Sequence, residues 1–313
     1  MSNVIKIGSL DISSFKVGSD DCKVYLGDTL LYPQSISYKL IAQHSDLSEY
    51  KTECNSSSML SSGETRADSA SASTINVQIG NCVNKIGQYA FSGYSSLTSI
   101  DIPSSVTNIG ALSFASCSSL TSVTIPSGVT FIGGSVFINC TGLTSVNIPN
   151  KIKTIRYGTF SNCSSLASID IPNNVTNIEK YVFYNCNSLT SVTLSNSLIS
   201  IDDSAFANCS NLTSIDMPNS VTNIGTNSFQ NCTGLTSVTI GSGVTNIEAE
   251  AFLNCSSLTS VTVEAKNPPN IGTSAFGNTN ECPIYVPSKS VDAYKSHRYW
   301  GVYASRIYPI LNS

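Results

Sequence analysis

The sequence predicts an α/β-poor repeat protein, a solenoid of ~23-residue rungs with a parallel β-sheet, a small N-terminal β unit and a C-terminal strand-helix cap. Three observations lead to this fold class. Phenylalanine recurs at a nearly constant spacing, cysteine and leucine follow it at fixed distances, and each rung contains a short segment in which apolar and polar residues alternate. The rungs are expected over residues 75–281.

The phenylalanine spacing defines the repeat. Nine of the eleven phenylalanines are separated by seven steps of 23 residues and one step of 24. They are Phe91, Phe114, Phe137, Phe160, Phe183, Phe206, Phe229, Phe252 and Phe276. A fixed period of about 20–29 residues with apolar residues in constant phase is typical of leucine-rich-repeat solenoids. We therefore expect a stack of similar rungs.

Each rung contains a Leu-x-x-(Ile/Val)-x-(Ile/Val) segment, of which Leu120, Val123 and Ile125 are an example. Alternation along a strand points Val123 and Ile125 into the core and Ser122 and Thr124 toward solvent. The apolar side chains of one rung stabilise it by less than the backbone entropy lost on ordering ~23 residues. Rungs must therefore stack, and this explains why the period is strict.

Seven of the eleven cysteines occupy one repeat position, three residues after the phenylalanine. They are Cys117, Cys140, Cys163, Cys186, Cys209, Cys232 and Cys255. A free cysteine behaves as a small buried hydrophobe. Stacked rungs hold their Cβ vectors parallel, which fits the dihedral angle of a disulfide poorly. The pattern predicts a ladder of reduced thiols and assembly in a reducing compartment.

Residues 1–36 are predicted to form a small β-rich attachment unit. Residues 4–7 and 10–12 alternate like strands, and residues 23–32 suggest two short strands around a Gly-Asp turn. A unit of this size does not bury a core alone, so it needs a partner. The candidate attachment residues are Val24, Tyr25, Leu26, Leu30, Leu31 and Tyr32. Residues 37–74 are expected to be an extended, serine-rich connector.

Residues 282–313 are predicted to cap the solenoid. Residues 282–287 suggest a last strand, and Ser288 or Ser290 is a suitable N-cap for a short helix. Large apolar side chains follow and are expected to cover the open end of the stack. They are Tyr294, Tyr299, Trp300, Tyr303 and Ile307.

Composition excludes several function classes. Charged residues make up 12% of the chain and do not cluster, and the net charge is −4. No nucleic-acid partner is therefore expected. No apolar run is long enough for membrane insertion, and no secretory signal is recognised at the start of the sequence. His44 and His297 lie far apart, and no Cys-x-x-Cys spacing occurs. We expect no catalytic residues, no metal site and no cofactor.

A binding surface is expected on the outward face of the predicted sheet. This face presents small hydroxyls with occasional carboxylates and no aromatic hot spots. The candidate binding residues are Ser99, Asp101, Ser122, Thr124, Ser145, Asn147, Ser168, Asp170, Ser191, Thr193, Ser214, Asp216, Ser237 and Thr239. A protein or a surface glycan is the expected ligand.

The rung sequence resembles the BspA-type leucine-rich repeat. The match is nearly intact at Ala205-Phe206-Ala-Asn208-Cys209-Ser-Asn-Leu212, and residues 284–295 resemble the usual terminal cap of that family. The resemblance covers residues 75–310. It implies a solenoid with one parallel sheet and a role in surface adhesion and partner binding, not catalysis.

The N-terminal stretch Lys23–Pro33 is similar to short segments of virion and tail proteins of phages that infect gut Bacteroidales. Together with the missing export signal, this resemblance favours a tail- or head-associated virion structural protein that displays the repeats for host or partner binding. The expected localisation is then the virion, and other virion or assembly proteins are the expected partners of residues 1–36. Two alternatives stay open: a bacterial cell-surface adhesin of the BspA type, and an intracellular protein-interaction scaffold.

Overall fold

The computed structural model describes residues 74–311 in full and, before them, the backbone of short strands between residues 5 and 60. These strands are β1 (Ile5–Ile7), β2 (Leu10–Ile12), β3 (Tyr25–Leu26), β4 (Thr29–Leu30), β5 (Tyr38–His44), β6 (Glu49–Glu53) and β7 (Met59–Leu60). Antiparallel pairing joins β1 to β2 and β3 to β4, and these strands lie in the segments where the sequence predicts strands.

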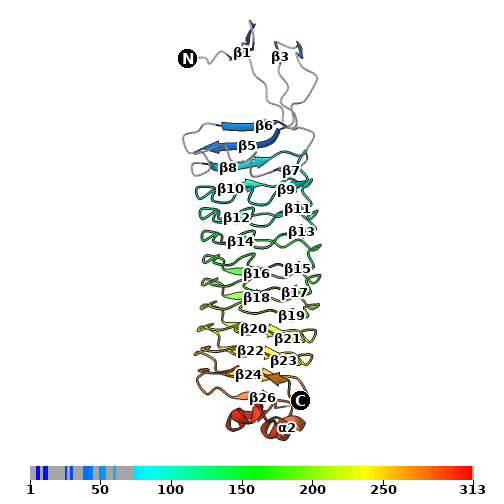
Figure 1. The fold of residues 1–313 in the computed structure, drawn as a ribbon, viewed down its shortest axis with the longest axis vertical. Helices are drawn as coiled ribbons and strands as arrows, with labels where there is room; N and C mark the ends of the chain where they lie inside the picture. The colour runs from blue at the N-terminus through cyan, green and yellow to red at the C-terminus, as the bar shows by residue number, and fades with distance from the viewer. Residues whose placement is uncertain are drawn as a thin grey trace.

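The rungs stack into an elongated solenoid with parallel strands on two sides (Figure 1). The first ladder contains β8 (Thr74–Ile79), β10 (Ser99–Asp101), β12 (Ser122–Val123), β14 (Ser145–Val146), β16 (Ser168–Asp170), β18 (Ser191–Thr193), β20 (Ser214–Met217), β22 (Ser237–Ile240), β24 (Ser260–Val263) and β26 (Ile284–Val286). Its strands come from the Leu-x-x-Ile segments. The predicted rung and its parallel strands are confirmed.

A second ladder lies on the other side of the stack, where the resemblance implied a single sheet. Its strands are β9 (Lys85–Ile86), β11 (Asn108–Ile109), β13 (Phe131–Ile132), β15 (Thr154–Ile155), β17 (Asn177–Ile178), β19 (Ser200–Ile201), β21 (Asn223–Ile224), β23 (Asn246–Ile247) and β25 (Asn270–Ile271). In both ladders the register advances by one repeat, as between Asn223 and Asn246. The Val-Thr-x-Ile segment therefore forms strands too.

The phenylalanine turn closes each rung on its third side. Asparagine precedes six of the seven ladder cysteines and adopts a left-handed φ, which is 63° at Asn208. A short amide side chain tolerates this conformation. Each Nδ2 donates to the Oδ1 of the asparagine one rung earlier, at 2.8 Å from Asn208 to Asn185. This asparagine ladder runs from Asn139 to Asn278 and ties the turns together.

At the N-terminal end, an antiparallel hairpin covers the first rung. β5 pairs with β6 on one side and with β8 on the other, so the first ladder begins β6-β5-β8-β10 (Figure 1). β7 pairs in parallel with β9 in the second ladder. Much of the stretch expected to be an extended connector, residues 37–74, therefore forms strands. The apolar alternation of Tyr38–His44 was too short to indicate this pairing from sequence.

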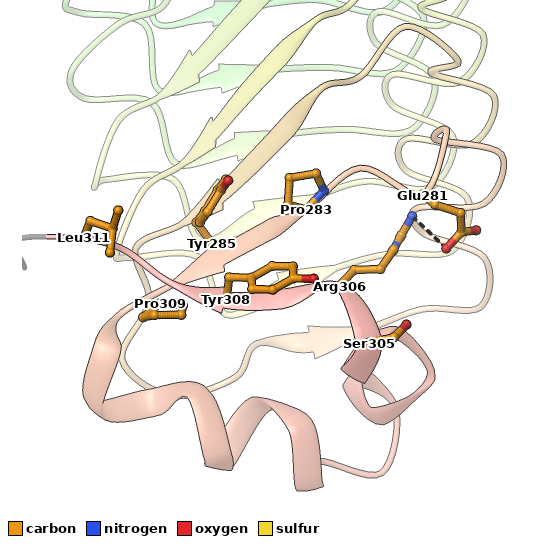
Figure 2. Close-up of a pocket in the computed structure, with 8 residues that line it drawn as sticks. All are labelled: Glu281, Pro283, Tyr285, Ser305, Arg306, Tyr308, Pro309 and Leu311. Carbon is orange, nitrogen blue, oxygen red and sulfur yellow. Dashed lines mark ion pairs between the residues drawn. The ribbon is translucent and has the colours of Figure 1, made fainter.

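At the C-terminal end, β26 is followed by α2 (Val291–Ser296) between the 3-10 turns η2 (Ser288–Ser290) and η3 (Trp300–Arg306). A further strand, β27 (Ile307–Pro309), pairs in parallel with β26, so the expected last strand is not the last (Figure 2). The Tyr294 hydroxyl donates to the Ala265 carbonyl at 2.8 Å.

The aromatic cap is largely as predicted. The side chains of Tyr294, Trp300 and Ile307 are fully buried, and the Trp300 indole donates to the Pro269 carbonyl at 2.7 Å. Tyr299 is an exception, because 53% of its surface is exposed. Ser290 precedes α2 but makes no side-chain cap hydrogen bond.

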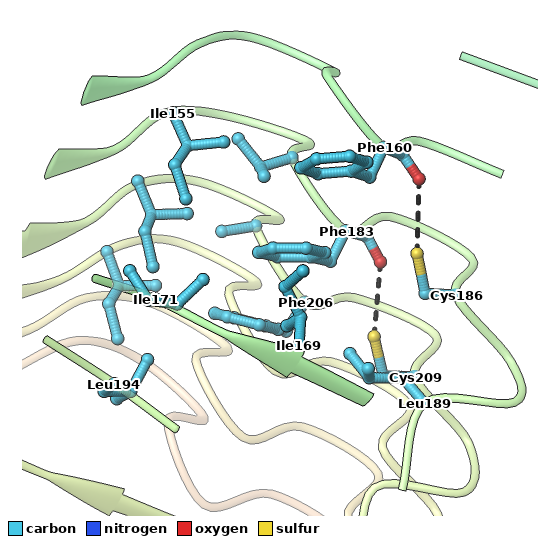
Figure 3. Packing of buried hydrophobic residues seen from close by; sticks show 14 of the residues in the cluster. Ile155, Phe160, Ile169, Ile171, Phe183, Cys186, Leu189, Leu194, Phe206 and Cys209 are labelled. Carbon is cyan, nitrogen blue, oxygen red and sulfur yellow. Dashed lines mark hydrogen bonds between the residues drawn. The ribbon is translucent and has the colours of Figure 1, made fainter. Parts of the chain in front are cut away.

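Phenylalanine rings stack along the whole core. Neighbouring ring centroids lie 5.0 to 5.7 Å apart, and the rings are nearly parallel (Figure 3). Each ladder cysteine donates its thiol to the carbonyl of the phenylalanine 26 residues earlier, as from Cys186 to Phe160 at 3.2 Å. All seven ladder cysteines are free, as the sequence predicts. Cys82 lies outside the ladder and is disulfide-bonded.

Within residues 74–311 and the described strands before them, no helix has the length and apolar character that a membrane crossing requires.

Candidate recognition surfaces

The outward residues of the first ladder lie where strand alternation predicts. From Ser99 to Asp216 the candidate binding residues are exposed, and Ser237 and Thr239 near the C-terminal end are half-buried. Their apolar neighbours, such as Val123 and Ile125, are buried. The first ladder therefore presents a polar surface made of short side chains. Whether this surface binds a ligand stays a prediction.

The first ladder is interrupted, and grooves lie at two of the interruptions. β10 and β12 are not paired, and neither are β14 and β16. The groove beside Asp101 has a volume of about 560 Å³, and that beside Asp170 has a volume of about 370 Å³. Ser99, Ser122 and Thr124 line the first groove, and Ser145 and Ser168 line the second. The structure thus brings some of the candidate residues into shallow depressions, whose linings also include apolar residues such as Ile100 and Ile169.

Several polar groups on the solenoid already bind its backbone. The Asn147 side chain accepts a hydrogen bond from the Ile125 amide at 2.7 Å and donates to the Ile125 carbonyl at 2.8 Å. Thr144 donates its hydroxyl to the Thr121 carbonyl one rung earlier at 2.9 Å. Asn147 therefore has a structural role, and part of the hydroxyl lattice holds rungs together.

A cluster of exposed aromatic residues lies on consecutive rungs at the corner after the second ladder. The exposed fraction is 52% for Tyr157, 38% for Tyr181 and 39% for Phe131. The ring centroids of Tyr157 and Tyr181 lie 5.6 Å apart, and Tyr184 lies 5.7 Å from Tyr181. We call Phe131, Arg156, Tyr157, Tyr181 and Tyr184 the tyrosine ridge.

Charged side chains hold the ridge in place. The Arg156 guanidinium lies 4.9 Å from the centroid of the Phe131 ring. Glu179 accepts a hydrogen bond from the Tyr157 amide at 2.7 Å, and its other oxygen lies 4.0 Å from Arg156. Lys180 pairs with Asp203 on the next rung at 2.7 Å, and this contact raises the pKa of Lys180. The aromatic side chains therefore project from turns that hydrogen bonds and ion pairs hold to neighbouring rungs.

Tyr181 has a backbone conformation that is unusual for a bulky residue. Its φ is 60°, in the left-handed region where glycine, asparagine and aspartate are favoured. Gly158, Ser204 and Asn227 occupy the same repeat position on other rungs. Tyr89, Leu112 and Glu250 adopt nearly the same φ at this position, so the left-handed conformation belongs to the repeated turn, and Tyr181 is a bulky residue accommodated in it.

The tyrosine ridge was not predicted from the sequence, although the repeat contains a signal for it. Several rungs continue after the second-ladder isoleucine with Gly and a small residue, as at Gly225 and Thr226. Residues 156–157 and 179–181 replace this pattern with Arg-Tyr and Glu-Lys-Tyr. Comparing each rung with its neighbours, position by position, would have found the departure.

The candidate attachment residues are only partly described. Tyr25 pairs with Leu30 in the β3–β4 hairpin, whose second pair is Leu26 with Thr29. Val24, Leu31 and Tyr32 lie outside the described residues. The attachment role therefore stays a prediction.

The described residues do not suggest catalysis. Burial raises the pKa of Cys186 and of Cys255 to about 12, which keeps both thiols protonated and poorly nucleophilic. Within the part of the chain that the structure describes, no group of three or more His, Cys, Asp or Glu side chains is arranged to hold a metal ion.

Comparison with known proteins places this architecture among bacterial repeat proteins. A family model described as BspA type leucine rich repeat region matches residues 68–190 and 176–296. A leucine-rich repeat protein from Bacteroides ovatus has a TM-score of 0.52 and 22% sequence identity, over 86% of this chain and 90% of that protein. One from Eubacterium ventriosum has a TM-score of 0.51 and 32% identity, over 61% of this chain and 50% of that protein. No curated protein matches the chain significantly.

Proposed function

We propose that this chain, which belongs to the BspA-type leucine-rich repeat family, is a recognition protein that binds a macromolecular partner through its solenoid and catalyses no reaction. Repeat solenoids present extended surfaces of this kind for binding. Protein partners fit best, because the surface concentrates aromatic and arginine side chains in one place.

The observation that supports this proposal most is the tyrosine ridge. Tyrosine and arginine are enriched among the residues that dominate binding energy at protein interfaces. Tyr157 and Tyr181 are exposed, and Glu179 and Asp203 anchor the loops that carry them. An anchored aromatic side chain loses little conformational entropy on binding. The hydroxyl face of the first ladder is then a second, weaker surface for a protein or a glycan.

The protein is proposed to act on a surface outside the reducing cytoplasm. The N-terminal resemblance favours a tail- or head-associated phage virion protein, and family membership favours a bacterial cell-surface adhesin. In both placements, residues 1–36 are proposed to attach the solenoid to its assembly.

Site-specific photo-crosslinking tests the recognition proposal. A photoreactive phenylalanine analogue replaces Tyr157 in one sample and Tyr89 in another, because Tyr89 is similarly exposed at 48% but lies on the first rung. Each labelled chain is incubated with intact cells and with purified particles from the source culture. We expect one defined partner to be crosslinked from position 157 and not from position 89. Equal crosslinking from the two positions would contradict a binding role for the ridge.

Two measurements distinguish localisation in the virion, at the bacterial cell surface and inside the cell. Mass spectrometry of purified particles finds the chain if it is a virion protein. Protease treatment of intact cells removes it if it is a cell-surface adhesin. A chain that is absent from particles and protected in intact cells is an intracellular scaffold.

A further inference from the structure

The outward face of the first ladder changes its chemistry at the C-terminal cap. Thr239, Thr262, Tyr285 and Tyr308 are successive partners in the register from β22 to β27, so a column of hydroxyl side chains ends in two tyrosines. Arg306 immediately precedes β27. This end of the face is therefore aromatic, with a buried arginine beside it, unlike the rungs before it.

Arg306 is a buried cation whose known contacts involve Nη1 and one face of the guanidinium. Only 6% of its surface is exposed, and its Nη1 donates to the Thr279 hydroxyl at 3.1 Å. Its guanidinium lies 5.0 Å from the centroid of the Tyr303 ring. Glu281 lies 3.8 Å from the same Nη1, but its side chain is 90% exposed, so this ion pair is loose. Thr279 and Tyr303 thus fix the plane of the guanidinium.

The other edge of the Arg306 guanidinium has no partner among the described residues. Both Nε and Nη2 are buried without a hydrogen bond. These two groups donate side by side, which matches the two oxygens of a carboxylate. Buried donors are nearly always paired in proteins, so two unpaired ones on a single side chain need an explanation, and a bound anion provides one.

A pocket of about 560 Å³ lies beside this arginine (Figure 2). Its lining includes Arg306, Tyr285, Tyr308 and Ser305, and the exposed carboxylate of Glu281 also borders it. The two tyrosine rings are 6.3 Å apart and inclined at 45°, and 48% of Tyr308 is exposed. A tyrosine offers an apolar ring and a polar tip, and a sugar ring presents the complementary pair, an apolar face and hydroxyls.

From this geometry we propose that the cap pocket binds a saccharide that bears a carboxylate. The sugar carboxylate accepts hydrogen bonds from Nε and Nη2 of Arg306, while Nη1 keeps its bond to Thr279 and its loose contact with Glu281 is given up. Tyr308 and Tyr285 pack against the sugar ring. The hydroxyls of Thr262 and Thr239 continue the polar column from the pocket, which favours an extended glycan over a peptide side chain. This site is separate from the tyrosine ridge and does not depend on it.

Calorimetric titration of the full chain tests the proposal. The probes are trigalacturonate, N-acetylneuraminate and the neutral galactose trimer. We expect at least one acidic probe to bind at least tenfold more tightly than the neutral trimer. Arg306→Lys keeps the charge but loses the paired donors, so it weakens acidic binding about tenfold or more. Tyr308→Ser weakens it about fivefold, whereas Tyr89→Ser, at an equally exposed tyrosine on the first rung (48%), leaves it unchanged.

Each other outcome overturns the proposal. If neither acidic probe binds, or if the neutral trimer binds equally well, the pocket does not recognise a sugar carboxylate. Tighter binding of a glutamate-containing tripeptide than of either sugar assigns the pocket to peptides. If Arg306→Lys does not fold, Tyr308→Ser decides, since its side chain is half exposed. Tyr181→Asn serves as a control: it leaves sugar binding intact and affects the ridge alone.

Discussion

Inside each rung, the phenylalanine and the cysteine depend on each other. The Phe183 ring stacks between those of Phe160 and Phe206, and the Phe183 carbonyl accepts the thiol hydrogen of Cys209. The stack is repeated without interruption from Phe91 to Phe276. One large side chain thus fills the core while its backbone provides the acceptor for the next thiol.

Replacing a stacked phenylalanine should cost far more stability than replacing an outward threonine. Phe183→Ala leaves a cavity in the core and should lower the free energy of unfolding by about 3–5 kcal/mol. Thr193→Ala removes an exposed hydroxyl and should cost less than about 0.5 kcal/mol. Thermal and denaturant unfolding of the two variants measure the difference. Similar losses in both would contradict the assignment of inward and outward positions.

The buried thiols should make the fold sensitive to alkali. Burial raises the pKa of Cys186 from 9.0 to about 12, so the folded state binds this proton more tightly than the unfolded state. The stability that the neutral thiol contributes is complete below about pH 9 and is lost as pH rises toward 12. Each pH unit in this window costs about 1.4 kcal/mol per thiol.

Unfolding experiments from pH 7 to pH 11 check this sign. Stability should be nearly constant to pH 8 and should then fall steeply. Cys186→Ala lowers stability at pH 7 but should make the alkaline decline shallower than in the parent chain. Because lysines and tyrosines also titrate in this range, the comparison of slopes is the decisive quantity. Identical slopes would show that the ladder thiols do not govern the decline.

Among the elements, the sequence predicts best what every rung repeats. The first-ladder strands, the buried phenylalanines and the free cysteine ladder follow from a period that recurs many times. The second ladder was missed because each of its strands is about two residues long, as in Asn223–Ile224, and shows no alternation by itself. Its strands exist because the neighbouring rungs place identical backbone groups in register.

Features that occur once were harder to predict. The β5–β6 hairpin binds the exposed edge of β8 through long-range pairing, which local alternation does not encode. The tyrosine ridge depends on residues from three rungs meeting at one corner. Arg306 reaches Thr279 across 27 residues, and no sequence pattern links them. Repetition thus made the core predictable, and its exceptions form the candidate sites.

For the whole molecule, both ends of the stack are covered. The β5–β6 hairpin covers the first rung, and α2, η3 and β27 cover the last. Exposed sheet edges pair with other chains, so a parallel solenoid needs both covers. In contrast, β1–β2 and β3–β4 form separate two-stranded sheets, which pair with no described strand of the solenoid. The N-terminal cover and the proposed attachment unit are thus different parts of the chain.

Two truncations should separate these parts. A chain that lacks residues 1–36 keeps β5 and β6 and should retain the oligomeric state of the full chain, although it should no longer join its assembly. A chain that lacks residues 1–60 exposes the edge of β8 and should self-associate. Light scattering after size-exclusion chromatography measures both states. If the chain that lacks residues 1–60 keeps the oligomeric state of the full chain, the β5–β6 hairpin is not needed to cover the edge of β8.

The proposed recognition role depends on the ridge being a binding surface and not a structural one. Tyr181 and Tyr89 occupy the same repeat position with nearly the same φ, 60° and 59°, but only Tyr181 belongs to the ridge. Asparagine occupies this position at Asn227, so Tyr→Asn relieves strain at either site. The two variants therefore match in structure and differ in location.

The most direct test is the affinity of Tyr181→Asn and Tyr89→Asn for the partner crosslinked from position 157, measured beside their melting temperatures. Both variants should melt at or above the temperature of the parent chain. Tyr181→Asn should bind at least tenfold more weakly, because it removes a central aromatic contact worth about 1.4 kcal/mol or more. Tyr89→Asn should bind as the parent does. Unchanged affinity in Tyr181→Asn, with its fold intact, would contradict recognition through the tyrosine ridge.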